Sequence, residues 1–145
     1  MIRSFARLAH PIATGAFVAC AIVQIFLAGL GVFDDPRAFV THREFGYLFG
    51  WLTLAALILA LLGRSPRRIT GLTALMLVQF ALQSIFVALR GDLPAIAALH
   101  PLNGVALLGV SIIATRRAWD ARRADVPSAA TSASTAPSLT PSDAR

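Results

Sequence analysis

Residues 12–33 read IATGAFVACAIVQIFLAGLGVF and contain no charged side chain. A helix rises about 1.5 Å per residue and the apolar core of a bilayer is about 30 Å thick, so roughly 20 such residues span it. Similar apolar segments lie at about residues 42–63, 69–89 and 97–118. Because backbone polar groups at lipid depth must be satisfied within a helix, the pattern predicts an all-α membrane protein, an up-and-down bundle of four transmembrane helices.

The overall composition also favours a membrane location. Of the 145 residues, 57% are hydrophobic and 14% are charged, whereas soluble domains have about 45–50% and about 25%. A globule of this size has too much surface for its volume to hide such an excess. We therefore expect residues 1–119 to form one transmembrane domain in the lipid bilayer of the cytoplasmic membrane.

All thirteen basic residues are arginines, and their distribution predicts the orientation of the chain. Nine flank the N-terminus, the connection between the second and third spans, and the end of the fourth span. Three, namely Arg37, Arg43 and Arg90, lie on the opposite side, and Arg145 ends the chain. Loops rich in arginine stay in the cytoplasm, so both termini are expected there. A nucleic-acid partner is excluded, because it would require basic residues along one polar face.

Local signals mark the ends of the spans. Thr41 and Glu44 have the spacing of a capping box at the start of the second span. His100 precedes a proline and is therefore expected at the cap position of the fourth. Residues 120–145 become rich in Ser, Thr, Ala and Pro, a composition that predicts a disordered cytoplasmic tail.

Two histidines form the most informative pair in the sequence. His42 opens the second span and His100 opens the fourth. In an up-and-down bundle these two helices are parallel and diagonal, so residues at one depth face each other across the core. Paired imidazoles can supply both axial ligands of a haem iron. The pair predicts His42 and His100 as metal ligands of one haem b; the alternative is that they are interfacial histidines without a role.

A glycine follows each of these histidines by four residues. Gly46 follows His42 and Gly104 follows His100, and residues at this spacing share a helix face. A glycine one turn below an imidazole leaves a flat notch in which a porphyrin can lie against the backbone. Close helix packing is the alternative explanation, since glycine is common in transmembrane helices for that reason.

A weak internal repeat accompanies the histidines. Gln24 precedes the first by 18 positions and Gln83 precedes the second by 17, so each half of the chain has a glutamine in one span and a histidine opening the next. The three arginines of the opposite side are expected to pair with haem propionates. Glutamines inside apolar spans usually bond across helices, and His10, near the other end, is expected to be an ordinary surface residue.

Three stretches carry a resemblance to known families: QIFLAGLG at residues 24–31, HREFGY at 42–47 and LHPLNG at 99–104. They resemble a family of small, uncharacterised four-span bacterial proteins and, more distantly, one four-helix half of haem A synthase. That resemblance covers about residues 10–118 and implies haem-ligating histidines at His42 and His100. The chain has one four-helix unit rather than two and no acidic residue deep in its first span. The resemblance therefore implies a stand-alone b-type cytochrome rather than the synthase activity.

Two functions follow from these patterns. The first is a membrane protein similar to b-type cytochromes, for one-electron transfer or haem handling, with a membrane redox partner or a quinone. The second is a cofactor-free accessory protein that packs, as a homo-oligomer or as a subunit, within a larger complex. No metalloprotease, phosphate-loop or dinucleotide-binding motif is present in the sequence.

Overall fold

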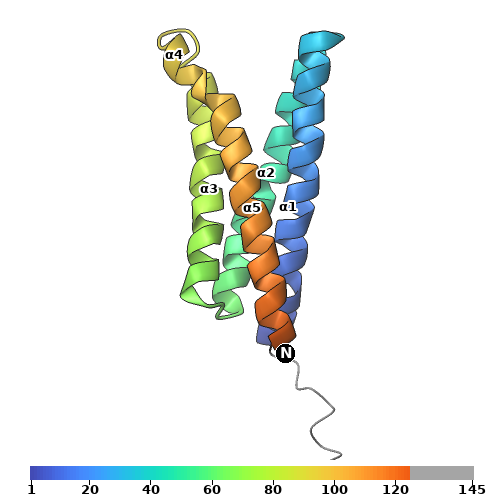
Figure 1. Ribbon diagram of the computed structural model, residues 1–145, viewed down its shortest axis with the longest axis vertical. Coiled ribbons are helices and arrows are strands. Elements are labelled where there is room, and N and C mark those ends of the chain that lie inside the picture. Colours follow the sequence, from blue (N-terminus) through green and yellow to red (C-terminus); the bar gives the residue numbers. More distant parts are fainter. Residues whose placement is uncertain (125–145) are drawn as a thin grey trace, which may run out of the picture.

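The computed structural model describes residues 1–124, and within that range the regular structure is entirely helical (Figure 1). The four long helices are α1 (Ile2–Phe33), α2 (Ala38–Leu62), α3 (Arg67–Ala88) and α5 (Leu99–Ala124), and the short α4 (Pro94–Ala97) precedes α5. The prediction of an all-α bundle of four long apolar helices is confirmed.

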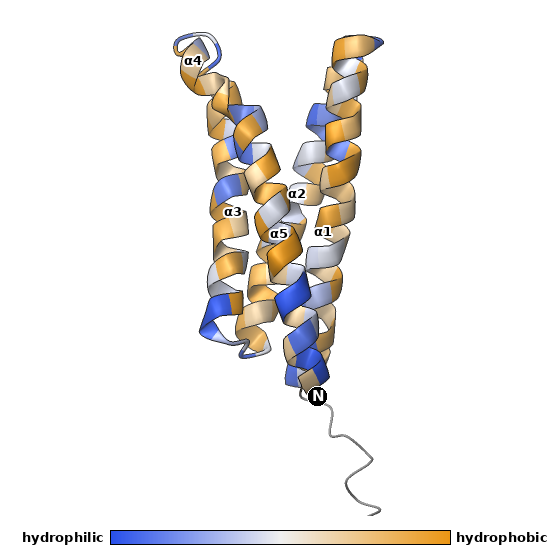
Figure 2. Cartoon of the chain, in the orientation of Figure 1, coloured by the Kyte–Doolittle hydropathy of each residue, from blue (hydrophilic) through white to orange (hydrophobic). Residues whose placement is uncertain are grey.

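The outer surface of the bundle is apolar over most of its length (Figure 2). Trp51 is 71% exposed and Leu48 is 70% exposed, an arrangement that would be unfavourable in water. Each long helix is also long and apolar enough to cross a membrane. The protein is therefore a multi-pass membrane protein whose exposed apolar side chains face lipid.

The long helices form two hairpins that pack against each other. Helix α1 packs on α2 and α5, and α3 packs on α2 and α5, so α2 and α5 are diagonal as predicted. Residues 63–66 connect the two hairpins at the end that also holds the N-terminus and the end of α5 (Figure 1). Toward the opposite end the hairpins diverge (Figure 1). Which of these ends faces the cytoplasm stays a prediction.

The bundle is held together by an apolar cluster to which every long helix contributes. Its largest members are Phe17 of α1, Phe49 of α2, Met76 of α3 and Leu107 of α5, all buried. In lipid, close van der Waals packing of this kind drives helix association because the surrounding acyl chains are equally apolar. The cluster is therefore the feature that fixes the two hairpins relative to each other.

The start of α2 differs from the prediction. The helix begins at Ala38, so Thr41 lies inside it and the expected capping box is wrong. Instead, the carboxylate of Asp35 accepts a hydrogen bond of 2.9 Å from the backbone N–H of Arg37. Short acidic side chains stabilise turns in this way. The Glu44 carboxylate pairs with Arg43 at 2.8 Å.

The ends of α5 also differ from the prediction. The helix begins at Leu99, so His100 is its second residue and not its cap. Pro101 is tolerated there, because the first N–H groups of a helix have no acceptor within it. At the other end α5 continues to Ala124, so residues 120–124 are helical and the predicted tail boundary at 120 is wrong. The remainder of that tail, 125–145, lies outside the described residues.

One close contact between hairpins gives a test of this packing. A methyl group at Gly50 would overlap the ring of Phe80 on α3, and that ring is already flanked by Phe49 at 6.0 Å and Phe17 at 6.3 Å between centroids. Gly50→Ala is expected to lower the free energy of unfolding by about 1–3 kcal/mol, as overpacking does. Thermal unfolding in mild detergent measures the effect.

The matched control is Gly109→Ala. No heavy atom lies within 4 Å of a Cβ at Gly109, so alanine is expected to be neutral or to stabilise α5 by up to about 1 kcal/mol. Equal unfolding temperatures for the two variants would contradict the packing of Phe80 on Gly50.

Candidate functional site

In the first hairpin, His42 is held against α1 by two hydrogen bonds. Its Nδ1 lies 3.0 Å from the carbonyl oxygen of Gln24. In return, the side-chain amide Nε2 of Gln24 donates to the carbonyl oxygen of His42 at 2.7 Å. The two residues are 18 positions apart, so this pair of bonds joins the C-terminal half of α1 to the first turns of α2.

In the second hairpin, His100 makes the corresponding contact with α3. Its Nδ1 lies 3.2 Å from the carbonyl oxygen of Gln83. Here the additional bonds come from Asn103, whose amide nitrogen donates at 2.8 Å to the side-chain oxygen of Gln83 and at 2.8 Å to the carbonyl oxygen of Gln79. The predicted repeat of glutamine and histidine therefore corresponds to a repeated contact, in which Nδ1 of the histidine bonds to the carbonyl oxygen of the glutamine.

The partners of the two histidines determine which ring nitrogen carries the proton. A backbone carbonyl only accepts hydrogen bonds, so Nδ1 of His42 and Nδ1 of His100 must each carry a hydrogen. In the neutral imidazole the second nitrogen, Nε2, then has a free lone pair. A histidine that binds a metal commonly has this arrangement, with one N–H on a carbonyl and the other nitrogen available.

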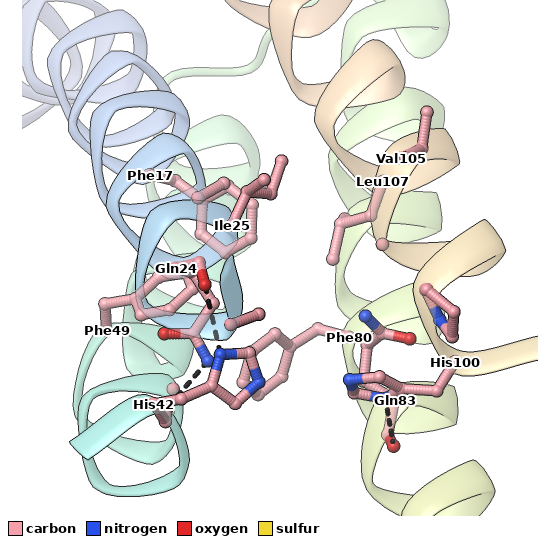
Figure 3. A pocket seen from close by; sticks show the side chains of 15 residues that line it. Phe17, Gln24, Ile25, His42, Phe49, Phe80, Gln83, His100, Val105 and Leu107 are labelled. Carbon is pink, nitrogen blue, oxygen red and sulfur yellow. Dashed lines mark hydrogen bonds between the residues drawn. The ribbon is translucent and has the colours of Figure 1, made fainter. Parts of the chain in front are cut away.

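The two imidazoles meet although they come from diagonal helices. Their ring centroids are 6.2 Å apart and their planes are inclined by 66°. Figure 3 shows the rings facing each other across a pocket, each with one nitrogen in a hydrogen bond to its own hairpin. The matched depth and mutual orientation expected from the sequence are therefore observed for His42 and His100.

A pocket of about 230 Å³ surrounds this pair and is lined by all four long helices. Its walls are mostly apolar, with Phe17, Phe49 and Phe80 among them (Figure 3). The polar groups on the wall are the two histidines and the glutamines that precede them, Gln24 and Gln83. The side-chain oxygen of Gln24 is buried and has no hydrogen-bond partner within residues 1–124. The pocket thus presents a buried acceptor in addition to two imidazole nitrogens.

Both predicted glycines line the pocket, but their close contacts are with the glutamines. A Cβ at Gly46 would lie 2.8 Å from Nε2 of Gln24, and a Cβ at Gly104 would lie 3.0 Å from Nε2 of Gln83. The notch expected below each histidine is therefore occupied in part by an amide. Each glycine lets the neighbouring helix approach closely enough to deliver the carbonyl that its histidine uses.

The three predicted arginines lie outside the wall of the pocket. Arg37 forms an exposed ion pair with Asp35 at 2.9 Å, and Arg43 forms one with Glu44 at 2.8 Å. Arg90 is exposed and contacts the carbonyl of Val87 at 3.5 Å. All three belong to the end of the bundle that holds the pocket, and their pairing with propionates stays a prediction.

The expectation that His10 is a surface residue is wrong. Its side chain is 2% exposed, and Nε2 lies 3.0 Å from the hydroxyl oxygen of Thr73. The cause is that α1 begins at Ile2, well before the predicted start at residue 12, so His10 lies inside the bundle. The hydroxyl of Thr73 donates to the carbonyl of Ile69 at 2.9 Å, so Nε2 of His10 is the donor of the pair.

Part of the site was not predicted. The sequence analysis missed the three phenylalanines of the pocket wall, because nine phenylalanines are spread over the chain without a pattern that separates these three. Within residues 1–124, no three His, Cys, Asp or Glu side chains are grouped so as to hold a metal ion. The pocket therefore brings together two imidazoles, and no third such side chain joins them within the described residues.

The hydrogen bonds predict a difference among the three histidines that can be measured directly. At about pH 8.5, where an ordinary imidazole is neutral, His42 and His100 are expected as Nδ1–H tautomers and His10 as the Nε2–H tautomer. Nitrogen-15 shifts of histidine-labelled protein distinguish the tautomers, and single His→Gln variants assign the signals. An Nε2–H tautomer at His42 or His100 would show that the carbonyl bonds are not formed.

Comparisons with known proteins place only part of the chain. No curated protein and no solved structure matches it, so the resemblance to haem A synthase stays an expectation from the quoted residues. One family model matches the segment from Gln24 to Leu89, which includes His42 but not His100. Over residues 24–89 the chain matches the model of a family of unknown function, DUF6220.

Proposed function

We propose that this membrane protein binds one haem b between α2 and α5, with His42 and His100 as the two axial ligands. The observation that carries the proposal is the opposition of two imidazoles whose Nδ1 atoms are already bonded to carbonyls. Two imidazole nitrogens on opposite sides of one metal, each about 2 Å from it, leave the ring centroids roughly 6 Å apart. The separation in this structure is 6.2 Å.

The number of ligands supports a haem over a bare metal ion. A structural zinc site takes four protein ligands, and the pocket offers two imidazoles without a third His, Cys, Asp or Glu among residues 1–124. A porphyrin supplies four nitrogens of its own and leaves two axial positions for the protein. The apolar wall of the pocket suits the macrocycle, because such ligand sites are mostly apolar with a few placed polar groups.

The pocket is smaller than a porphyrin, and the topology provides the means to enlarge it. The hairpins are joined covalently by residues 63–66, at the end away from the histidines, and they diverge toward the pocket (Figure 1). Each His–Gln hydrogen bond lies within one hairpin. The wall around the two rings can therefore adjust to a macrocycle without breaking the bonds that orient them, while the ring separation of 6.2 Å already suits a shared metal.

The chemistry available at such a site is one-electron transfer or haem handling. A bound haem supplies the redox change, and the chain holds the ring, excludes water and sets the polarity around it. The pocket lies near one end of the bundle, so exchange with a partner or a quinone at that face is favoured over transfer across the whole membrane. The exposed Arg37, Arg43 and Arg90 at this end are the candidates to pair with the propionates.

A visible spectrum tests the proposal. Protein expressed with added haem and purified in mild detergent is expected to show sharp Soret and α bands in a reduced-minus-oxidised spectrum. His42→Gln and His100→Gln are each expected to lose the low-spin bands, because one axial ligand is removed. Colourless protein after haem-replete expression would contradict the proposal.

The matched control is His10→Gln, which changes a histidine of the same protein outside the pocket wall. Its glutamine amide can still donate to Thr73, so the spectrum is expected to remain. Loss of the bands in all three variants, with unchanged unfolding temperatures, would show that the histidines of α2 and α5 are not the specific ligands.

A cofactor-free accessory role is the second candidate, and open glycine faces favour it. No heavy atom lies within 4 Å of a Cβ placed at Gly29, Gly71 or Gly109. Small residues on a lipid-facing surface let another helix approach closely. This function predicts colourless protein that purifies with a partner chain and tolerates substitution of His42 and His100.

A further inference from the structure

A second pocket, of about 280 Å³, lies at the opposite end of the bundle. Its wall includes Arg7 and His10 of α1, Ser65 of the turn between the hairpins, and Ala121 and Arg122 of α5. Figure 2 shows hydrophilic residues gathered at this end of the bundle, beside the N-terminus. The pocket therefore joins both hairpins at the depth where the helices end and lipid headgroups begin.

The charges around this pocket are almost all positive. Nine arginines lie at this end, and Asp120 is the one acidic residue there within residues 1–124. Asp120 is exposed and is not part of the pocket wall. Of the arginines, Arg7 and Arg122 are the two that line the pocket. The site is thus suited to an anion and not to a cation.

Arg122 can bind an anion without giving up a structural hydrogen bond. Its guanidinium carbon lies 5.7 Å from the centre of the Trp119 ring, a cation–π contact that is not a hydrogen bond and so uses none of its N–H donors in one. No hydrogen bond or ion pair of Arg122 is formed within the part of the chain that the structure describes. Arg7 is anchored differently, since its Nε donates to the carbonyl of Gly63 at 3.1 Å.

His10 adds an acceptor to the same wall. Its Nε2–H is used by Thr73, so in the neutral ring Nδ1 keeps a lone pair, and no hydrogen bond within residues 1–124 uses that nitrogen. A ligand that carries both a phosphate and a hydroxyl group matches this combination of guanidinium donors and one acceptor. Lipid headgroups with a phosphodiester and a glycerol hydroxyl have this chemistry.

We propose that the pocket formed by Arg7, His10 and Arg122 binds the headgroup phosphate of an anionic phospholipid. Basic pockets between transmembrane helices are suited to such headgroups, and charge-assisted bonds from arginine to phosphate are strong and directional. The site is separate from the histidine pair, and the proposal does not depend on haem binding.

The experiment measures the unfolding temperature of haem-free, full-length protein in mild detergent. Phosphatidylglycerol, phosphatidylcholine with the same acyl chains, and inorganic phosphate are added separately. Phosphatidylglycerol is expected to raise the unfolding temperature, whereas the other two leave it nearly unchanged. Equal stabilisation by inorganic phosphate would overturn the assignment to a lipid, and equal stabilisation by phosphatidylcholine would overturn the requirement for an anionic headgroup.

Two variants locate the binding site, each compared with its own lipid-free protein. Arg122→Gln is expected to weaken phosphatidylglycerol binding roughly tenfold, the size of effect of one lost charge-assisted bond. Ala121→Leu fills the pocket without changing the charge and is expected to weaken binding similarly. Native mass spectrometry of the bound lipid checks both results.

The matched control is Arg123→Gln, which removes the same charge from the adjacent, exposed residue outside the pocket wall. It is expected to keep the binding of phosphatidylglycerol. Equal losses in Arg122→Gln and Arg123→Gln would show a diffuse attraction to the arginine-rich end, and full binding by Ala121→Leu would place the lipid elsewhere. Either result overturns the proposal.

Discussion

Each imidazole at the histidine pocket is oriented by a hydrogen bond to a carbonyl group on the preceding long helix. Nδ1 of His42 bonds to Gln24 at 3.0 Å and Nδ1 of His100 bonds to Gln83 at 3.2 Å. At this depth an unpaired N–H would cost about as much free energy as a lost hydrogen bond. The two hydrogen bonds therefore stabilise this orientation of the rings. Because the acceptors belong to helical backbone, their positions are fixed, and each ring leaves its acceptor only by rotating its own side chain.

The two hairpins differ in the additional hydrogen bonds that surround this contact between histidine and carbonyl. In the first hairpin the amide of Gln24 returns a bond to the carbonyl of His42, whereas in the second the side-chain oxygen of Gln83 accepts from Asn103. Ring orientation is therefore a property of each hairpin alone. The distance between the rings is instead set by packing between hairpins, through the cluster that contains Phe17 and Met76. Orientation and spacing are thus controlled by separate interactions.

The sequence predicted the four spans and the facing histidines because both follow from helix periodicity and bilayer thickness. It did not predict the start of α1 at Ile2, since a hydropathy pattern stops at Arg7 although a long cationic side chain can extend from a buried helix toward water. The burial of His10 was missed because its partner, Thr73, is 63 residues away. The tautomers could not be predicted either, because the sequence does not show which backbone carbonyl on another helix accepts the hydrogen bond of each histidine.

The interior between the two pockets limits proton transfer along side chains from one end of the bundle to the other. The apolar cluster of Phe17, Phe49, Met76 and Leu107 lies at the core of the bundle, and its side chains carry no hydrogen-bonding groups. The buried hydroxyls nearby do not bridge it, because those of Thr53 and Ser111, for example, donate to carbonyls of their own helices. Proton movement along side chains requires a connected series of donors and acceptors, and none is formed there among residues 1–124. With haem bound as proposed, a redox change at the histidine pocket would therefore proceed without proton transfer along side chains to the arginine-rich end.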